Sequence, residues 1–186
     1  MADRGEEGAW RKVIFAADSP QGWFYFAVDG ERLKRIWLPG EDLPAGADQA
    51  RSVTAEGAPP WLGELVADLR AYLAGQAVDL RRWCARLDWD GLSPFQRRVY
   101  RALLEIGRGR TCTYAELAER CGSPRGARAV GAAMASNPFP PIVPCHRVVA
   151  RRGLGGYGGG LGLKRRLLEL EGALPAAASD ARANPS

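Results

Sequence analysis

Residues 113–149 read TYAELAERCGSPRGARAVGAAMASNPFPPIVPCHRVV. Thr113 followed three residues on by Glu116 is a capping box, which predicts the start of a helix there. Ser123-Pro124 predicts the start of a second helix, with proline at its first position. That helix must stop near Asn137-Pro138, because a residue before proline disfavours the helical conformation. Two helices separated by about three residues that include a glycine are typical of a helix-turn-helix.

The end of this stretch places a cysteine beside a histidine. Residues 137–144 contain four prolines and lead stiffly into Cys145-His146-Arg147. A thiol is a weak nucleophile until it loses its proton, and a nearby imidazole can lower its pKa. His146 is the only histidine of the chain. In an extended strand the two side chains would point to opposite faces, so their pairing requires a bend or a bridging water. Packing or chance would also account for such a dipeptide.

The second helix of the pair has an unusual surface. Arg125 and Arg128 project from residues that are otherwise mostly Gly and Ala, without the Asn, Gln and Lys that read base edges. Small side chains permit the close approach that a narrow minor groove demands. A helix packed tightly inside the protein would have the same composition. Arg128 favours the DNA interpretation, since a long cation is costly to bury without a partner.

The sequence on either side of this stretch predicts two more helices. Ser93-Pro94-Phe95-Gln96 forms another capping box, and the apolar residues that follow at four-residue spacing run towards Gly107. Leu163, Leu167, Leu168 and Leu170 predict a last helix that Gly172 ends. The Ala- and Pro-rich residues 174–186 are expected to be disordered.

The first half predicts a small sheet and one helix. Strands are expected at 13–15, 23–28 and 33–38, with Asp29-Gly30 as a hairpin turn, and together they form a small antiparallel sheet. Residues 41–58 have the composition of a loop, and a further strand is expected within 78–89. Trp61, Leu65, Leu69 and Leu73 recur every four residues and predict a helix. We therefore expect an α+β chain with disordered residues 1–9, a first domain over 10–91 and a second over 92–173.

Charge and composition narrow the function. Residues 1–92 carry a net charge of −4 and residues 93–186 a net charge of +9. A basic half beside an acidic one suggests contact with a polyanion, although an arginine-rich composition from a GC-rich genome would look similar. No apolar run is long enough to span a membrane, and the first residues are not a secretory signal. The four cysteines form no C-x-x-C pair, which favours reduced thiols in the cytosol and no metal site.

These motifs resemble the O6-alkylguanine-DNA alkyltransferase family (methylated-DNA–protein-cysteine methyltransferases). The resemblance runs from Ser93 to Gly172 and is densest over Ile142–Val149, the family's active-site signature. The segment Ala127–Gly131 and the pairs Asn137-Pro138 and Gly156-Tyr157 also match in order. The first half matches only in shape. The resemblance implies an RNase H-like N-terminal sheet with a helix, followed by a helical domain with a winged helix-turn-helix-like DNA-binding motif.

The resemblance also implies roles for single residues. Cys145 would accept the alkyl group, and His146 would take its proton through a bound water while Glu171 orients the imidazole. Asn137 would brace the turn between the recognition helix and the active site. Tyr114 would press on the phosphate 3′ to the lesion and help protonate the departing guanine.

Further residues would contact DNA or the flipped base. Arg128 would fill the gap left in the base stack, and the backbone near Val148 would read the base edge. The implied DNA contacts are Arg128, Tyr114, Ala127, Ala129, Gly131 and Arg125. The implied lesion pocket consists of Met134, Pro140, Val148, Tyr157, Gly158 and Gly159. Gly158 is a departure, because many family members carry a serine there, and the preferred adduct is therefore open.

The implied activity is a single, irreversible transfer that needs no cofactor. Its partner would be double-stranded DNA containing O6-alkylguanine, with O4-alkylthymine as a second candidate lesion, bound through the minor groove by a monomer in the bacterial cytosol or nucleoid. Three alternatives remain. A non-catalytic alkyltransferase-like protein would lack the cysteine, a helix-turn-helix regulator would need base-reading side chains, and a cysteine hydrolase would turn over many times.

Overall fold

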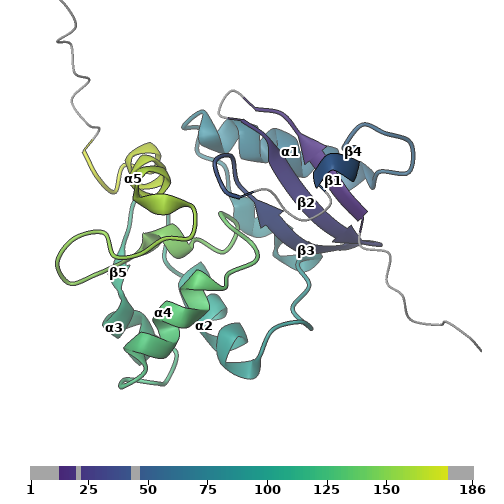
Figure 1. Cartoon of the computed structure of the whole chain (residues 1–186). Coiled ribbons are helices and arrows are strands. Elements are labelled where there is room, and N and C mark those ends of the chain that lie inside the picture. The colour runs from purple at the N-terminus through teal and green to yellow at the C-terminus, as the bar shows by residue number, and fades with distance from the viewer. Residues whose placement is uncertain (1–12, 20–21, 43–46, 176–186) are drawn as a thin grey trace, which may run out of the picture.

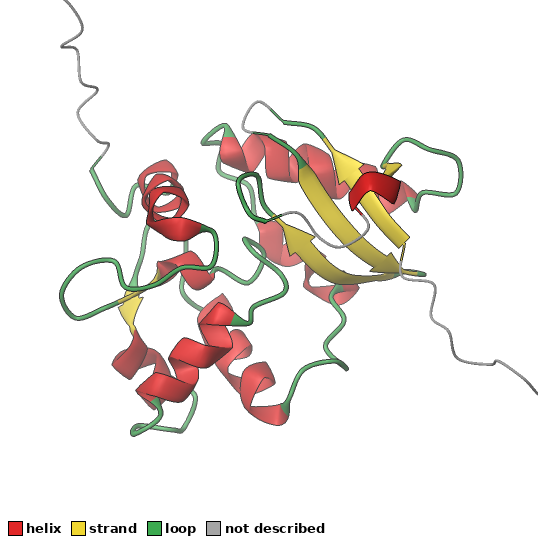
Figure 2. Ribbon diagram, viewed as in Figure 1, coloured by secondary structure: helices red, strands yellow, loops and turns green. Residues whose placement is uncertain are grey.

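The computed structural model describes residues 13–19, 22–42 and 47–175. The sequence predicts disorder for residues 1–9 and 174–186. All of these positions except 174 and 175 lie outside the described residues. Figures 1 and 2 show a sheet with a helix against it on one side and a group of helices on the other. The chain is α+β, as the sequence predicts.

The sheet of the first half has four strands in the order β3-β2-β1-β4. Strands β1 (Val13–Ala17), β2 (Phe24–Asp29) and β3 (Arg32–Trp37) are antiparallel, close to the expected positions. Strand β4 (Arg51–Ser52) lies in the segment predicted as loop and pairs in parallel with β1, so the sheet is not purely antiparallel. Both of its residues are exposed, and a short exposed strand carries no apolar alternation that would reveal it. A single 3-10 turn, η1 (Ala47–Gln49), precedes it.

Helix α1 (Pro60–Leu73) covers one face of this sheet (Figure 1). Its four-residue repeat of apolar residues is buried, as predicted. The strand expected within 78–89 is wrong, because residues Leu80–Arg86 form the 3-10 helix η2. Asp79 caps this helix by accepting from the backbone of Arg81, and Leu80 and Trp83, three residues apart, are both buried on one side.

The second half, as far as residue 175, contains four α-helices and a small parallel pair of strands. They are α2 (Pro94–Leu104), α3 (Tyr114–Arg120), α4 (Ala127–Ala135) and α5 (Gly160–Leu170), with β5 (Cys112–Thr113) beside β6 (Val148–Val149). Both predicted capping boxes are present, at Ser93 and at Thr113. Gly172 follows α5 with a φ of +76°, a conformation that glycine adopts without the strain a Cβ would cause.

Helix α4 begins later than the sequence predicts. Residues 123–126 form a turn in which the Gly126 N–H donates to the Ser123 carbonyl over 2.7 Å. The helix therefore starts at Ala127. A Cβ at Gly126 would lie 2.5 Å from the Ser123 hydroxyl oxygen, so this tight turn requires glycine. The connection from α3 to α4 therefore spans residues 121–126 and is longer than the three residues expected.

The two halves meet along strand β3, the edge of the sheet. The Ile36 N–H donates to the carbonyl of Pro138 over 2.8 Å and so joins the two halves, whereas the Asp88 N–H donates to the carbonyl of Leu33 over 2.9 Å within the first half. Buried side chains from both halves belong to one hydrophobic core. The proline-rich approach to Cys145 is thereby tied to an otherwise open strand edge. Among the described residues, no helix is both long and apolar enough to cross a bilayer.

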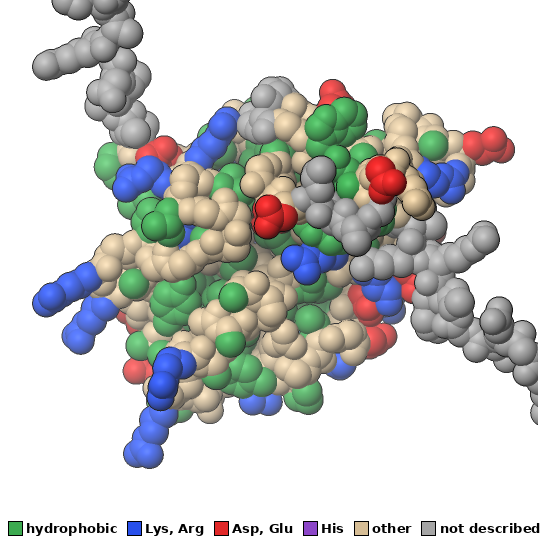
Figure 3. Space-filling view, viewed as in Figure 1, with side chains coloured by type: hydrophobic (Ala, Val, Ile, Leu, Met, Phe, Trp, Pro, Cys, Tyr) green, Lys and Arg blue, Asp and Glu red, His purple; other side chains and the backbone are tan. Residues whose placement is uncertain are grey.

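Charged side chains are unevenly spread over the surface. Figure 3 shows Lys and Arg side chains projecting from the side of the molecule formed by α3, α4 and the loop before α5. Arg125, Arg128, Arg151 and Arg152 are exposed in these segments. The positive charge of the second half is thus concentrated where a polyanion could lie.

Candidate active site

Cys145 lies at the start of a single 3-10 turn, η3 (Cys145–Arg147), directly after Pro144. Such a turn has three residues, so neighbouring side chains point about 120° apart rather than to opposite faces. The bend that a Cys-His pair requires is therefore present. The thiol is 6% exposed and the imidazole of His146 is fully buried. All four cysteines are free.

Asn137 connects the end of α4 to the thiol. Its Nδ2 donates to the carbonyl of Val143 over 2.8 Å and to Sγ of Cys145 over 3.1 Å. Its Oδ1 accepts from the backbone N–H of Phe139 over 3.1 Å. All of these groups are buried, so the amide fixes both the chain that carries the cysteine and the direction of the sulfur lone pair.

Glu171, just past the end of α5, binds the far side of the imidazole. Nε2 of His146 lies 3.0 Å from Oε1 of Glu171. Arg147 holds the same carboxylate with two hydrogen bonds of 2.8 Å, from Nε to Oε2 and from Nη2 to Oε1. Nδ1 of His146 is buried and has no hydrogen-bond partner among the described residues. That nitrogen is free to exchange a proton.

The electrostatic environment keeps these groups in defined protonation states. Burial raises the pKa of Cys145 to about 11, although the Asn137 hydrogen bond and the charge of Lys164 oppose this. Burial lowers the pKa of His146 despite its bond to Glu171. Burial also disfavours ionisation of Glu171, but hydrogen bonds from His146 and Arg147 outweigh it and lower that pKa. At rest the site contains a neutral thiol, a neutral imidazole and a carboxylate, so the thiol needs a base before it can react.

Two adjoining cavities meet at the thiol. One, of about 230 Å³, opens towards α3 and α4, and Tyr114, Gly131 and Gly156 are among its lining residues. The other, of about 260 Å³, lies towards the sheet, with Glu41, Pro140 and Gly159 in its wall. The residues that line both are Met134, Ala135, Cys145, Tyr157 and Gly158. Cys145 therefore lines both cavities, so that a ligand in either one would lie beside it.

Helix α4 presents its small residues to solvent. Arg128, Ala129, Ala132 and Ala135 are exposed, whereas Val130, Ala133 and Met134 are buried. The alternative of a helix packed inside the protein on its Gly/Ala surface is thus wrong. Arg128 makes no hydrogen bond or ion pair with the described residues. An unpaired cation on a surface of small side chains suits close approach to a polyanion.

Comparison with known proteins identifies the family. A family model described as "6-O-methylguanine DNA methyltransferase, DNA binding domain" matches residues 94–173. The methylated-DNA–protein-cysteine methyltransferase of Mycobacterium leprae is 43% identical over 158 residues, which cover 83% of this chain and 88% of that protein. This chain belongs to the methylated-DNA–protein-cysteine methyltransferase family. The resemblance found in the sequence is confirmed.

Solved structures of alkyltransferases agree over most of the chain. The crystal structure of the Mycobacterium tuberculosis O6-methylguanine methyltransferase superposes with a TM-score of 0.68 at 38% identity, covering 89% of this chain and 96% of that one. A structure of the Mycobacterium tuberculosis OGT in complex with DNA gives the same TM-score at 37% identity, covering 87% and 93%. The likeness includes the N-terminal half, which the family model does not reach.

Tyr114, at the start of α3, lines the cavity that opens towards α3 and α4. Its hydroxyl donates to the carbonyl of Gly156 over 3.3 Å. A Cβ at Gly131 would lie 4.0 Å from its ring, and one at Gly155 only 2.9 Å. Glycine at 155 therefore permits the close approach of the ring. Burial raises the pKa of Tyr114, so its hydroxyl keeps its proton.

Of the residues expected to form the lesion pocket, all but Val148 line at least one of the two cavities. Val148 is buried but lines neither cavity. Its carbonyl accepts from Nζ of Lys164 over 2.6 Å, and the same ammonium donates to Gly156 over 3.0 Å. Burial lowers the pKa of Lys164 to about 8. Sequence reasoning missed this lysine, although its place one turn before Leu167 and Leu168 on the apolar side of α5 could have revealed it.

Two residues of the N-terminal half also belong to the site and were missed. Glu41 stands in the wall of the second cavity, where burial raises its pKa. Tyr72 of α1 reaches the His146–Glu171 pair from across the molecule. The sequence gives no motif that would mark either residue as part of a site. Glu41 lies in a segment predicted only as a loop, and Tyr72 in one predicted only as a helix.

Proposed function

We propose that this protein repairs DNA by moving an alkyl group from O6 of guanine to Sγ of Cys145. The observation that supports this best is the thiol itself: it is buried at the junction of two cavities, bonded to Asn137, and adjoined by the His146–Glu171 pair. Relatives that share most of the chain are named methylated-DNA–protein-cysteine methyltransferases.

The reaction we infer uses each of these groups. Nδ1 of His146 takes the thiol proton, directly or through a water, while Asn137 and Lys164 stabilise the developing thiolate. The sulfur then attacks the alkyl carbon, a C–S bond forms, and the C–O6 bond breaks. The departing guanine accepts a proton as it leaves, which Tyr114 is placed to assist. The product thioether contains no carbonyl for water to attack, so each molecule reacts once.

The guanine must leave the duplex to reach the sulfur. Extrusion of a nucleotide costs a few kcal/mol, and a side chain inserted into the stack offsets part of this. We infer that Arg128 is that side chain and that α4 enters the minor groove, since its exposed residues are small and Arg128 is unpaired. In this proposal α3 and α4 serve as a winged helix-turn-helix-like unit and a monomer suffices. The sheet with α1 would be the RNase H-like domain.

Gly158 affects which adducts fit. A Cβ at Gly158 would meet no atom within 4 Å, so the pocket is open where many relatives carry serine. Backbone N–H groups and Tyr114 are then left to bind the lesion oxygen. We infer that O6-methylguanine is the main substrate and that bulkier groups, and O4-alkylthymine, are also admitted.

A stoichiometric transfer assay tests this proposal. Duplex DNA carrying O6-[³H]methylguanine is incubated with increasing amounts of protein. We expect label on the protein to rise to one equivalent and stop, and Cys145→Ala to bind the same duplex without taking label. Many turnovers would instead indicate a hydrolase, and binding without any transfer would indicate a lesion-recognition protein.

A further inference from the structure

Tyr72 brings a hydroxyl from the N-terminal half into the catalytic centre. The residue lies near the end of α1 and is 1% exposed. Its hydroxyl donates to Oε1 of Glu171 over 2.7 Å and lies 3.2 Å from Nε2 of His146. The two partners are 99 and 74 residues away along the chain. The apolar residues of α1 already pack the helix against the core, so the helix does not need the Tyr72 hydrogen bond in order to fold.

We propose that Tyr72 is a positioning residue that, together with Glu171, fixes the tautomer of His146. The Tyr72 hydroxyl has one hydrogen to donate. Its shorter contact is with Glu171, whose ionised carboxylate can only accept, so the hydrogen is donated to Glu171. The phenol oxygen can then approach Nε2 favourably only if Nε2 carries a hydrogen. Glu171 makes the same demand on Nε2. Both neighbours therefore place the proton on Nε2 and leave the lone pair on Nδ1. This inference rests on the proposed function, in which Nδ1 is the base.

The carboxylate between them is fully committed. It accepts from Tyr72, His146 and twice from Arg147. A buried carboxylate survives without water only when its lone pairs are satisfied in this way. Burial raises the pKa of Tyr72 well above its usual value, with Glu171 adding to the effect, so the phenol keeps the hydrogen it donates.

Arg108 holds Tyr72 and Glu171 opposite each other. Its guanidinium lies 5.6 Å from the centre of the Tyr72 ring. It donates to the carbonyls of Gly75 and Gln76 after α1, over 3.0 and 3.1 Å, and to that of Leu170 at the end of α5. A cation at two helix C-termini is favoured by both dipoles. Tyr72 and Glu171 lie within one turn of these ends, so the clamp sets their separation.

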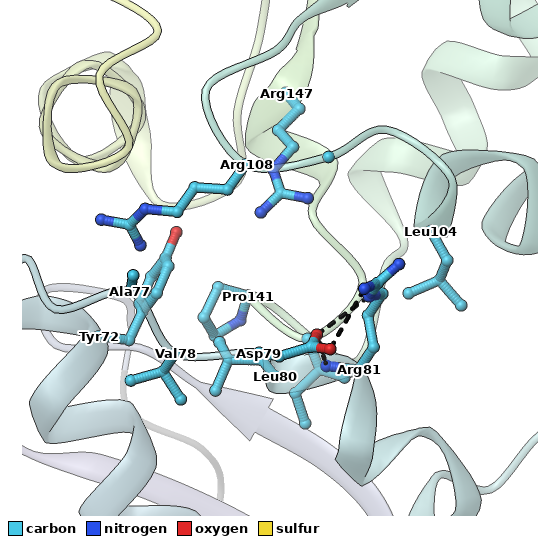
Figure 4. Close-up of a pocket in the computed structure, with 12 residues that line it drawn as sticks. Tyr72, Ala77, Val78, Asp79, Leu80, Arg81, Leu104, Arg108, Pro141 and Arg147 are labelled. Carbon is cyan, nitrogen blue, oxygen red and sulfur yellow. Dashed lines mark hydrogen bonds and ion pairs between the residues drawn. The ribbon is translucent and has the colours of Figure 1, made fainter.

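Tyr72 and Arg108 border a cavity between the two halves. It has a volume of about 260 Å³, and Figure 4 shows Tyr72, Arg108 and Arg147 on one side of it and the Asp79–Arg81 pair on another. The phenol therefore stands where the N-terminal half meets the catalytic groups. Through this hydroxyl, the position of α1 contributes, together with Glu171, to holding the His146 proton on Nε2.

The inference predicts the behaviour of Tyr72→Phe. Without the phenol hydrogen Glu171 becomes more basic, which raises the affinity of His146 for a second proton. The acid limb of the single-turnover rate–pH profile should move to higher pH, and the plateau rate should fall about tenfold. The DNA concentration that gives half of the maximal rate should not change, because Tyr72 is 1% exposed and cannot contact DNA. Loss of DNA binding in place of rate would contradict the proposal.

Nitrogen NMR of ¹⁵N-histidine protein provides the direct test, since His146 is the only histidine and gives one pair of ring signals. We expect the wild type to show Nε2 protonated and Nδ1 unprotonated at neutral pH, and Tyr72→Phe, in which Glu171 still holds the Nε2 proton, to show a changed Nε2 signal and a higher imidazole pKa. Trp83→Phe is the control, because it removes a different hydrogen bond of the same half, from Nε1 to Asp68 over 2.8 Å. It should keep the wild-type Nε2 signal and imidazole pKa.

A wild type with the proton on Nδ1 overturns the proposal without any variant, and so does a Tyr72→Phe protein with wild-type Nε2 signal, titration and rate. The NMR readout needs no DNA. A wild type that transfers no methyl group would contradict the proposed function alone, and the tautomer result would still stand or fall by itself.

Discussion

The side-chain amide of Asn137 donates to Sγ of Cys145 over 3.1 Å, and the same nitrogen donates to the carbonyl of Val143 over 2.8 Å. One side chain thus joins the end of the exposed helix α4 to the nucleophile. A shift of α4 on DNA would change the position of the Asn137 amide relative to the sulfur, because that amide cannot move without losing one of its buried hydrogen bonds.

Asn137→Ala should therefore impair both folding and chemistry. It leaves the Phe139 N–H without a partner and removes one of the two hydrogen bonds to the Val143 carbonyl, which still accepts from the Cys145 N–H, and this should cost about 1–3 kcal/mol of stability. It also removes the hydrogen bond that lowers the thiol pKa, so the transfer rate should fall by more than about tenfold. Urea unfolding and single-turnover transfer measure the two effects. Ser136→Ala, at an exposed neighbour, should change stability by less than about 0.5 kcal/mol. A fully active Asn137→Ala protein would remove the proposed link.

Arg128→Ala should slow the repair of duplex DNA far more than the reaction with free O6-benzylguanine. The free base needs no flipping, so only the duplex reaction uses an inserted side chain. The ratio of the two rates is the quantity to measure. Arg101→Ala, which removes an exposed arginine from α2, should leave that ratio unchanged. Equal losses on both substrates in Arg128→Ala would refute insertion into the stack.

Gly155→Ala should disturb the pocket mouth. Gly155 has a φ of +70°, and a Cβ there would lie 2.9 Å from the Tyr114 ring. Gly153 has a φ of +90° but open space around its Cβ. Both substitutions should cost about 1 kcal/mol through backbone strain, and only Gly155→Ala should also displace Tyr114 and lower the transfer rate. Comparison of unfolding and rate for the two variants separates strain from the clash. Equal rates would mean that the ring tolerates the methyl group.

The transfer rate should persist in mildly acidic solution. The folded pKa of His146 lies below its usual value of about 6.5, because burial disfavours the imidazolium. The imidazole therefore stays neutral at pH 6.5, and the rate should fall only at lower pH. The free energy of unfolding should follow the same direction as the rate. Because His146 binds a proton more readily in the unfolded chain than in the folded one, the folded state should become less stable as the pH drops below about 6.5. A rate already halved at or above that pH would contradict this environment.

Local patterns in the sequence predicted much of the fold. The capping boxes at Ser93 and Thr113 and the apolar repeat of α1 are set by residues three or four apart, so they can be read without knowing the fold. The start of α4 was predicted too early, because the turn at Gly126 depends on a close contact with Ser123 that spacing does not reveal. Strand β4 was missed because it consists of two exposed residues.

The candidate site was predictable only in part. Cys145, His146 and Asn137 lie within ten residues and form a recognisable motif. Tyr72 could not have been found this way, since it meets Glu171 across 99 residues and in the sequence is one more apolar position of a helix. The spacing of Lys164 from Leu167 and Leu168 could have marked it as facing the core, but the two carbonyls that bind its ammonium, of Val148 and Gly156, are brought to it only by the fold.

Intact-protein mass spectrometry after incubation with a duplex containing one O6-methylguanine tests the central proposal most directly. We predict that the mass of each molecule increases by one methyl group. Peptide fragmentation should place this group on Cys145 and not on Cys84, Cys112 or Cys121. Protein of unchanged mass beside repaired DNA, or a methyl group on any other residue, would contradict the proposal.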